Sequence, residues 1–114
     1  MTVSDAIDRA EGIYKYGGGY KRLIEWLSEL EEKISIELFH TEKENKLNIK
    51  SELTAPDAYA ELYPLYLVMK ATFAEGRSDK YNDYARFFNR AYSEYIDYVN
   101  RARKTEKTVY YTIL

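Results

Sequence analysis

The sequence contains no cysteine, one histidine and only two prolines among its 114 residues. Without cysteine the chain forms no disulfide and no thiolate metal site, and a single His40 excludes a centre that needs two imidazole ligands. No apolar run approaches the roughly 20 residues that a membrane-spanning helix requires. The first residues also lack the basic segment and apolar stretch of a secretory signal. We therefore expect a cytoplasmic protein with no metal, cofactor or membrane partner.

A large charge of one sign is also missing. Seventeen basic and 19 acidic residues leave a net charge of −2, so the chain lacks the overall positive field that supports nucleic-acid binding. Basic residues gather only near the C-terminus, at Arg101, Arg103, Lys104 and Lys107. This run is the candidate for contact with DNA phosphates, and any such contact would be local.

Tyrosine, in contrast, is abundant. Eight of the 13 tyrosines lie between residues 55 and 101, and a tyrosine side chain suits a surface that is half buried and half wet. Tyrosines next to basic residues can also stack on single-stranded nucleic acid, but here most of them lie on helical stripes that predict a core. The length and the 46% hydrophobic content predict one domain, 1–114, with a core of residues 3–103 and an extension of residues 104–114.

The N-terminal half contains two patterns typical of amphipathic helices. Residues 3–13 carry apolar side chains at helical spacing, with Thr2 or Ser4 as the N-cap. Residues 20–39 place apolar side chains at steps of three and four, and charged residues fill the opposite face. His40 follows the second pattern, and we interpret it as a helix cap rather than as a catalytic base.

Three consecutive glycines, Gly17 to Gly19, separate these two helices. Such a run loses too much backbone entropy on ordering to lie inside a helix, so it predicts a flexible joint or a close approach between two helices. A phosphate-binding loop would need a preceding strand and a following Lys-Ser or Lys-Thr pair, and the sequence has neither.

A third helix is predicted from Pro56 at its first position through Phe73. Pro64 lies inside this pattern, so the helix either kinks there or restarts with Pro64 in its first turn. Gly76 is placed to cap its C-terminal end.

The fourth helix gives the strongest pattern in the chain. It begins with Ser78 or Asp79 as N-cap and runs to about Arg103, with an apolar stripe at nearly ideal spacing. Phe87 and Tyr98 fall outside that stripe. Exposed aromatic residues of this size often mark a partner surface, although a wider core stripe would also account for them.

Two short strands are also predicted. Residues 46–53, which follow a polar loop at residues 40–45, alternate between apolar and polar side chains. Residues 108–114 are rich in β-branched and aromatic side chains. The terminal strand would pair with residues 46–53 or with a sheet in a neighbouring molecule. The expected fold is mainly α, a four-helix bundle with a short strand or hairpin element and an extended C-terminal strand.

No catalytic arrangement with mechanistic spacing is present. Glu29 with Glu32, and Asp79 with Asp83, place carboxylates on one helical face, but no helix carries the Glu-x-x-His pair that would complete a metal site. The serines in helical surroundings have no second group to activate them. We therefore expect a protein that is not an enzyme.

Four segments in order carry a family resemblance over roughly residues 3–101. They read VSDAIDRAE, IEWLSELEEKISIELF, AYAELYPLYL and FAEGRSDKYNDYARFFNRAYSEYIDYVNR. In this order and spacing the chain resembles the small head-tail connector, or adaptor, proteins of tailed bacteriophages and prophages of the Firmicutes type.

The resemblance implies a structural protein of the virion, assembled in the host cytoplasm. Such a protein forms a homo-oligomeric ring, expected to be a dodecamer, under the portal protein. The ring extends the DNA channel, contains DNA without reading its sequence, and connects to the next neck or tail-completion protein.

The residues that would serve this role are predicted from the aromatic pattern. We expect Tyr63, Phe87 and Tyr98 at the contacts between ring subunits. The portal would be bound by the terminal strand, through Val109, Tyr110, Tyr111 and Ile113.

Two other functions remain open on the sequence. One is a cytoplasmic helical module that binds another protein, such as a phage-encoded regulator or inhibitor. The other is a DNA-binding packaging protein, whose affinity would fall steeply with salt.

Overall fold

The computed structural model describes residues 1–41 and 46–113, with side chains described up to residue 104. Four α-helices and one short 3-10 helix follow one another: α1 (Val3–Ile13), α2 (Tyr20–Phe39), η1 (Asp57–Tyr59), α3 (Leu62–Ala74) and α4 (Ser78–Ile113). The fold is mainly α, as the sequence predicts. No strand occurs within the described ranges, and none of the helices described is long and apolar enough to cross a bilayer.

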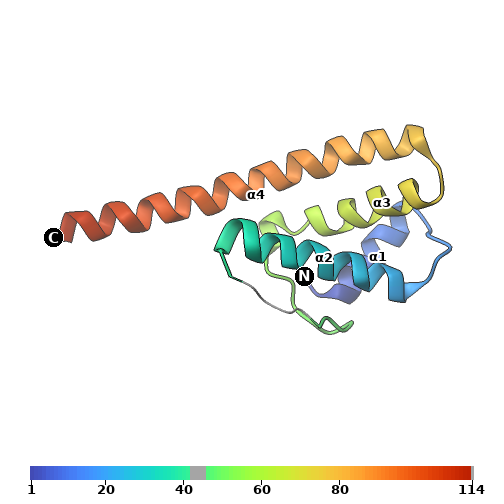
Figure 1. The fold of residues 1–114 in the computed structure, drawn as a ribbon, viewed down its shortest axis with the longest axis horizontal. Helices are drawn as coiled ribbons and strands as arrows, with labels where there is room; N and C mark the ends of the chain where they lie inside the picture. The colour runs from blue at the N-terminus through green and yellow to red at the C-terminus, as the bar shows by residue number, and fades with distance from the viewer. Residues whose placement is uncertain (42–45, 114) are drawn as a thin grey trace.

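Helix α3 lies at the centre of the molecule and contacts α1, α2 and α4 (Figure 1). Its central position explains why it is apolar on almost every side. Helix α4 runs alongside α3 and then continues past the other helices, so that its C-terminal part projects beyond them (Figure 1). At 1.5 Å per residue, its 36 residues span about 54 Å, close to the 56 Å length of the whole molecule.

Helices α1 and α2 extend over the residues that the sequence predicts. Thr2 is the N-cap of α1: its side chain accepts a hydrogen bond from the Asp5 N–H, and the Asp5 carboxylate accepts one from the Thr2 N–H. His40 ends α2 in the left-handed conformation, at φ 54°, which confirms it as a cap.

The prediction that Pro56 begins the third helix is wrong. Pro56 precedes η1, and α3 begins at Leu62 with Pro64 in its first turn. Nitrogens in the first turn of a helix have no intrahelical acceptor, so proline loses no hydrogen bond there. The restart at Pro64 is therefore the alternative that the fold adopts.

The predicted strand at residues 46–53 is also wrong. The Asn48 side chain accepts a hydrogen bond from the Lys50 N–H, and the Ser51 hydroxyl accepts one from the Asn48 N–H. These local bonds close a turn and replace a strand ladder. Only one isolated bridge, between Thr2 and Glu52, joins this segment to the N-terminal residues. The loop expected at residues 40–45 lies outside the described residues from 42 onward.

The expected C-terminal strand is a helix instead, because α4 continues through Ile113. Residues 46–53 form no strand that it could join. A helix that has already nucleated gains one hydrogen bond for each residue it adds, and β-branched residues weaken this only slightly. The extension of residues 104–114 is thus a continuation of α4 over the residues described.

The turn between α3 and α4 depends on Gly76, which confirms the predicted cap. Gly76 has a φ of 71°, its N–H donates to the Phe73 carbonyl, and the Arg77 N–H donates to the Thr72 carbonyl at 2.8 Å. This pair of bonds satisfies carbonyls that the end of α3 leaves without partners.

The glycines between α1 and α2 approach this same turn rather than another helix. The Gly17 N–H donates to the Glu75 carboxylate at 2.9 Å, and the Tyr14 hydroxyl donates to the other oxygen of that carboxylate. These two bonds lower the pKa of Glu75, with the Tyr14 bond as the larger cause. Glu75 thus joins the α1–α2 loop to the α3–α4 turn.

Replacing Gly76 by alanine should lower the free energy of unfolding by about 1 kcal/mol, because the left-handed conformation is unfavourable for a residue with a Cβ. Gly12 is the matched control: it lies exposed inside α1, and a Cβ there would meet no atom within 4 Å. Gly12→Ala should leave stability unchanged or raise it by up to about 1 kcal/mol. Urea titration of both variants measures the difference, and equal effects would contradict this view of the turn.

The lowered pKa of Glu75 predicts a dependence of stability on acid pH. Because folded Glu75 binds its proton more weakly than the unfolded chain does, its contribution is complete above the ordinary value of 4.5 and disappears as pH falls. Wild type should therefore lose more stability than Glu75→Gln between about pH 5 and pH 3. Urea titrations across that range test this, and parallel curves for the two proteins would contradict it.

Candidate protein interaction surface

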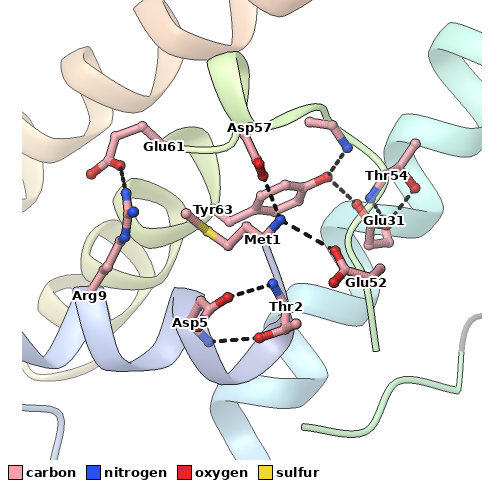
Figure 2. A network of polar contacts seen from close by, with 11 residues as sticks. Met1, Thr2, Asp5, Arg9, Glu31, Glu52, Thr54, Asp57, Glu61 and Tyr63 are labelled. Atoms are coloured by element: carbon pink, nitrogen blue, oxygen red, sulfur yellow. Dashed lines mark hydrogen bonds and ion pairs between the residues drawn. The ribbon is translucent and has the colours of Figure 1, made fainter. Parts of the chain in front are cut away.

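A buried carboxylate connects α2, α3 and the loop before η1 (Figure 2). Glu31 in the middle of α2 is only 2% exposed. One of its oxygens accepts a hydrogen bond from the Tyr63 hydroxyl at 2.6 Å. The other accepts bonds from the Thr54 N–H at 2.9 Å and the Thr54 hydroxyl at 2.6 Å. Tyr63 in turn accepts a bond from the Ala55 N–H at 2.9 Å, so every polar group in the network has a partner.

This network changes the role expected for Tyr63. Its side chain has no exposed surface, so it cannot contact a neighbouring ring subunit. Burial raises the pKa of the Tyr63 hydroxyl, and the nearby Glu31 carboxylate raises it further. Tyr63 is therefore removed from the predicted subunit contacts and assigned to the core.

The loop fixed by Glu31 forms one wall of an open groove where α4 leaves the rest of the molecule. Thr54 and Pro56 line the groove from this loop, Phe39 lines it from the end of α2, and residues of α4 complete the lining. The groove has a volume of about 380 Å³, and we call it the root groove. The residues that α4 contributes to it are Tyr95, Tyr98, Val99, Ala102 and Arg103.

Tyr98 holds the position expected for a partner-facing aromatic residue. Its side chain is 37% exposed, and its ring stacks on Tyr59 with centroids 4.6 Å apart. Tyr95 beneath it is buried, and that burial raises its pKa to about 12. Tyr98 therefore presents part of its ring at the surface, on a base formed by the half-buried Tyr59 and the buried Tyr95.

Phe87 is also exposed, at 48% of its surface. It lies on the same helix, three turns before Tyr98, and meets Tyr84 edge to face with ring centroids 5.6 Å apart. Phe88, the following residue, and Tyr92 point into the core, where their rings stack with centroids 5.6 Å apart. The surface position of Phe87 and Tyr98 agrees with the sequence pattern, while their role in a ring stays a prediction.

The basic residues of the expected DNA contact begin at the same place. The Arg103 guanidinium lies over the Phe39 ring at 5.8 Å from its centroid, so this arginine packs at the root of the projecting helix. Arg101 and Lys104 are exposed on the neighbouring turns and have interactions of their own. The Lys107 side chain lies outside the described part, although its backbone belongs to α4.

The four residues expected to bind the portal lie on the last turns of α4. Val109, Tyr110, Tyr111 and Ile113 have helical backbone, and the end of α4 lies away from the other helices (Figure 1). Their side chains fall outside the described residues. The backbone of these residues is helical and forms no strand, and their binding to the portal stays a prediction.

Sequence reasoning missed two features of this surface and one at the other end of the molecule. Glu31 was placed on no face in particular, although its position next to the apolar Leu30 and one turn from Leu27 and Ile34 is the signal that could have found it. Phe39 was identified only as the last residue of its helix, and it is 40% exposed. Phe73, at the opposite end of the molecule, is 68% exposed and pairs with the Tyr81 ring at 5.3 Å.

Comparison with known proteins identifies no relative: no family model matches the chain, and no curated protein or solved structure matches it significantly. The function must therefore follow from the residues and their geometry.

Removing the Tyr63 hydroxyl tests the buried network. Tyr63→Phe leaves the Ala55 N–H without its acceptor and takes one donor from Glu31, so the free energy of unfolding should fall by about 1 to 3 kcal/mol. Tyr59 is the matched control, since its ring stacks on Tyr98 and its hydroxyl has no hydrogen-bond partner among the described residues. Tyr59→Phe should change stability by less than about 0.5 kcal/mol. Chemical denaturation measures both variants, and equal losses would show that the network does not stabilise the loop.

Proposed function

We propose that this chain is a structural protein of the bacteriophage head-tail junction. In this role it forms a ring under the portal protein, extends the DNA channel and connects to a neck or tail-completion protein. The protein acts by binding, with no catalytic step and no cofactor, and its place is the assembled virion.

The projecting end of α4 is the observation that carries this proposal (Figure 1). An isolated helix of about a dozen residues is only marginally stable in water, so a segment of this kind gains most of its stability from a partner. All seven residues after Lys107 are apolar, aromatic or β-branched, which suits a helix that becomes buried on binding. The order of segments that resembles the phage adaptors points to the portal as that partner.

Charge is distributed unequally between the body of the protein, residues 1–100, and its C-terminal segment, residues 101–114. Residues 1–100 contain 13 basic and 18 acidic side chains, whereas residues 101–114 contain four basic and one acidic. The body of the protein is therefore acidic, with a formal charge of −5, and the projecting segment is basic, with +3. A basic segment next to the channel would contact DNA phosphates without reading base sequence, as an extension of the channel requires.

In the proposed ring, the lateral contacts use the exposed side of α4. Phe87 and Tyr98 are the aromatic residues of this side with large exposed surface, and aromatic side chains dominate the energy of protein interfaces. A ring requires that one surface of each subunit meets a different surface of the next. Its expected form is a dodecamer on the portal.

A second function is favoured by the root groove. An open groove lined by aromatic and aliphatic side chains is a common site for a peptide or helix of another protein, and a groove of this kind does not require a ring. In this alternative the chain is a cytoplasmic helical module that binds and regulates another protein.

Co-purification with the portal protein encoded in the same genome tests the proposed function. Wild-type chain should bind tagged portal and appear as a ring in electron micrographs. Deleting residues 108–114 should abolish binding, and Tyr110→Ala or Ile113→Ala should weaken it about tenfold or more, as expected for anchor residues. Phe73→Ala is the control, because Phe73 lies at the other end of the molecule and should leave portal binding intact.

Three results would reject the proposed function or redirect it. Undiminished binding by the truncated chain would exclude the end of α4 as the docking element. A chain that ignores the portal altogether would favour the regulatory module. Binding to DNA alone, with an affinity that falls steeply as salt rises, would favour a packaging protein.

A further inference from the structure

One side of α4 remains available for a partner even within the folded molecule. Helix α4 packs mainly against α3, and its buried stripe faces that way. Beside this stripe, Tyr84, Phe87 and Ala91 follow one another at steps of three and four residues, and Tyr98 lies a further seven residues on, past the charged Glu94. None of the four is fully buried. We call this set the flank of α4.

The flank carries a projecting side chain and borders a groove. Phe87 projects with almost half of its surface exposed, and Tyr98 borders the root groove. The two residues are 11 positions apart, which is three helical turns, so they lie on the same side of α4 about 17 Å from each other. A surface that has both parts on one side can meet a second copy of itself when a twofold axis relates the two copies.

We infer that two copies of the free chain pair through the flank of α4 in antiparallel orientation. In this pair, Phe87 of each copy occupies the root groove of the other. The register places residue 87 opposite residue 98 and centres the contact between Tyr92 and Ser93. The Phe87 side chains and the root grooves of both copies are then buried in one contact with twofold symmetry.

The charges along α4 favour this register. It places Arg101 and Lys104 opposite the turn that contains Asp79 and Asp83. It also places Glu94 and Asp97 opposite the turns of Arg86 and Arg90. The turn of residues 79–83 stays net negative because its two carboxylates outnumber Lys80. Facing turns thus carry net opposite charge, beside the pairs that Asp83 makes with Arg86 and Glu94 with Arg90 within each α4. The two helix dipoles also run in opposite directions.

A parallel pair would lack these advantages. It would place Phe87 against Phe87 and leave both root grooves empty. It would also bring the basic turns of the two copies, at residues 101–104, next to each other. Like charges side by side raise the free energy of association, so the antiparallel pair is favoured.

This inference concerns the free chain and does not rest on the proposed function. If the chain also forms a ring, the pair covers Phe87 and Tyr98 and must separate before lateral ring contacts form. Pairing would then keep these aromatic surfaces covered until the portal is present.

Mass measurement by analytical ultracentrifugation, across micromolar to millimolar concentration, tests the pair. Wild type should be a dimer whose dissociation constant rises at least tenfold in Phe87→Ala, which removes the projection. Ala102→Trp should weaken the dimer to a similar extent, because it fills the groove from an exposed position. Tyr20→Ala removes a large exposed ring from the start of α2, which is not part of the α4 contact, and should leave the dimer unchanged.

Cross-linking tests the orientation, and the absence of native cysteine makes it direct. Asp83→Cys mixed with Ala102→Cys should give a cross-linked pair with a short flexible bismaleimide. Each variant alone should not, because like positions in the antiparallel pair lie about 28 Å apart along the helices. Cross-linking of either variant with itself would overturn the orientation.

The mass data also separate this inference from the proposed function. A monomer at every concentration, or a dimer indifferent to Phe87→Ala and Ala102→Trp, would overturn the pair. A ring-sized particle without the portal would overturn it as well, while agreeing with the proposed function. Portal binding is measured independently, so a dimer that ignores the portal supports the pair and rejects the ring.

Discussion

The buried carboxylate of Glu31 is the interaction on which the surface of this molecule depends. A charge removed from water has to be compensated by hydrogen bonds, and Glu31 receives them from Tyr63 in α3 and Thr54 in the loop. Three segments that are distant in sequence are thereby fixed to one another. Exposed ion pairs such as Arg9 with Glu61 add at most about 1 kcal/mol each, so they do not compete with this network.

The same loop determines where α4 can bind a partner. With Thr54 held by Glu31, Pro56 lies beside α4, and Tyr59 in η1 supports Tyr98. The root groove thus follows from the polar network beneath it. A hydrogen-bonded loop is a firm wall for an aromatic side chain, since a rigid groove loses little entropy on binding.

Much of the helical fold is predictable because it follows from local patterns. The bounds of α1 and α2, the cap at His40 and the turn at Gly76 agree with the sequence, since capping and helical periodicity involve neighbouring residues. The two strand predictions were wrong because a strand also needs a partner strand elsewhere in the chain. Without such a partner, residues 48–51 form local hydrogen bonds through the Asn48 and Ser51 side chains instead.

The candidate surface was predictable only in part, because it also depends on contacts between residues that are distant in sequence. Phe87 and Tyr98 can be identified because they leave the apolar stripe of their own helix. Tyr63 could not be told from them, since its burial depends on a carboxylate 32 residues earlier in the chain. The root groove also joins residues from α2, the loop and α4, and no single segment contains the pattern that would reveal it.

The two proposed assemblies compete for one side of α4, and the geometry indicates how both can occur. A twofold pair uses the flank on itself, whereas a ring must place it against a different surface of the next subunit. The projecting end of α4 takes no part in the central contact of the pair, so a portal could bind it while the pair persists. Once several chains are held on a symmetric template, their effective concentration rises, and the lateral contact can replace the pair without any change in the fold.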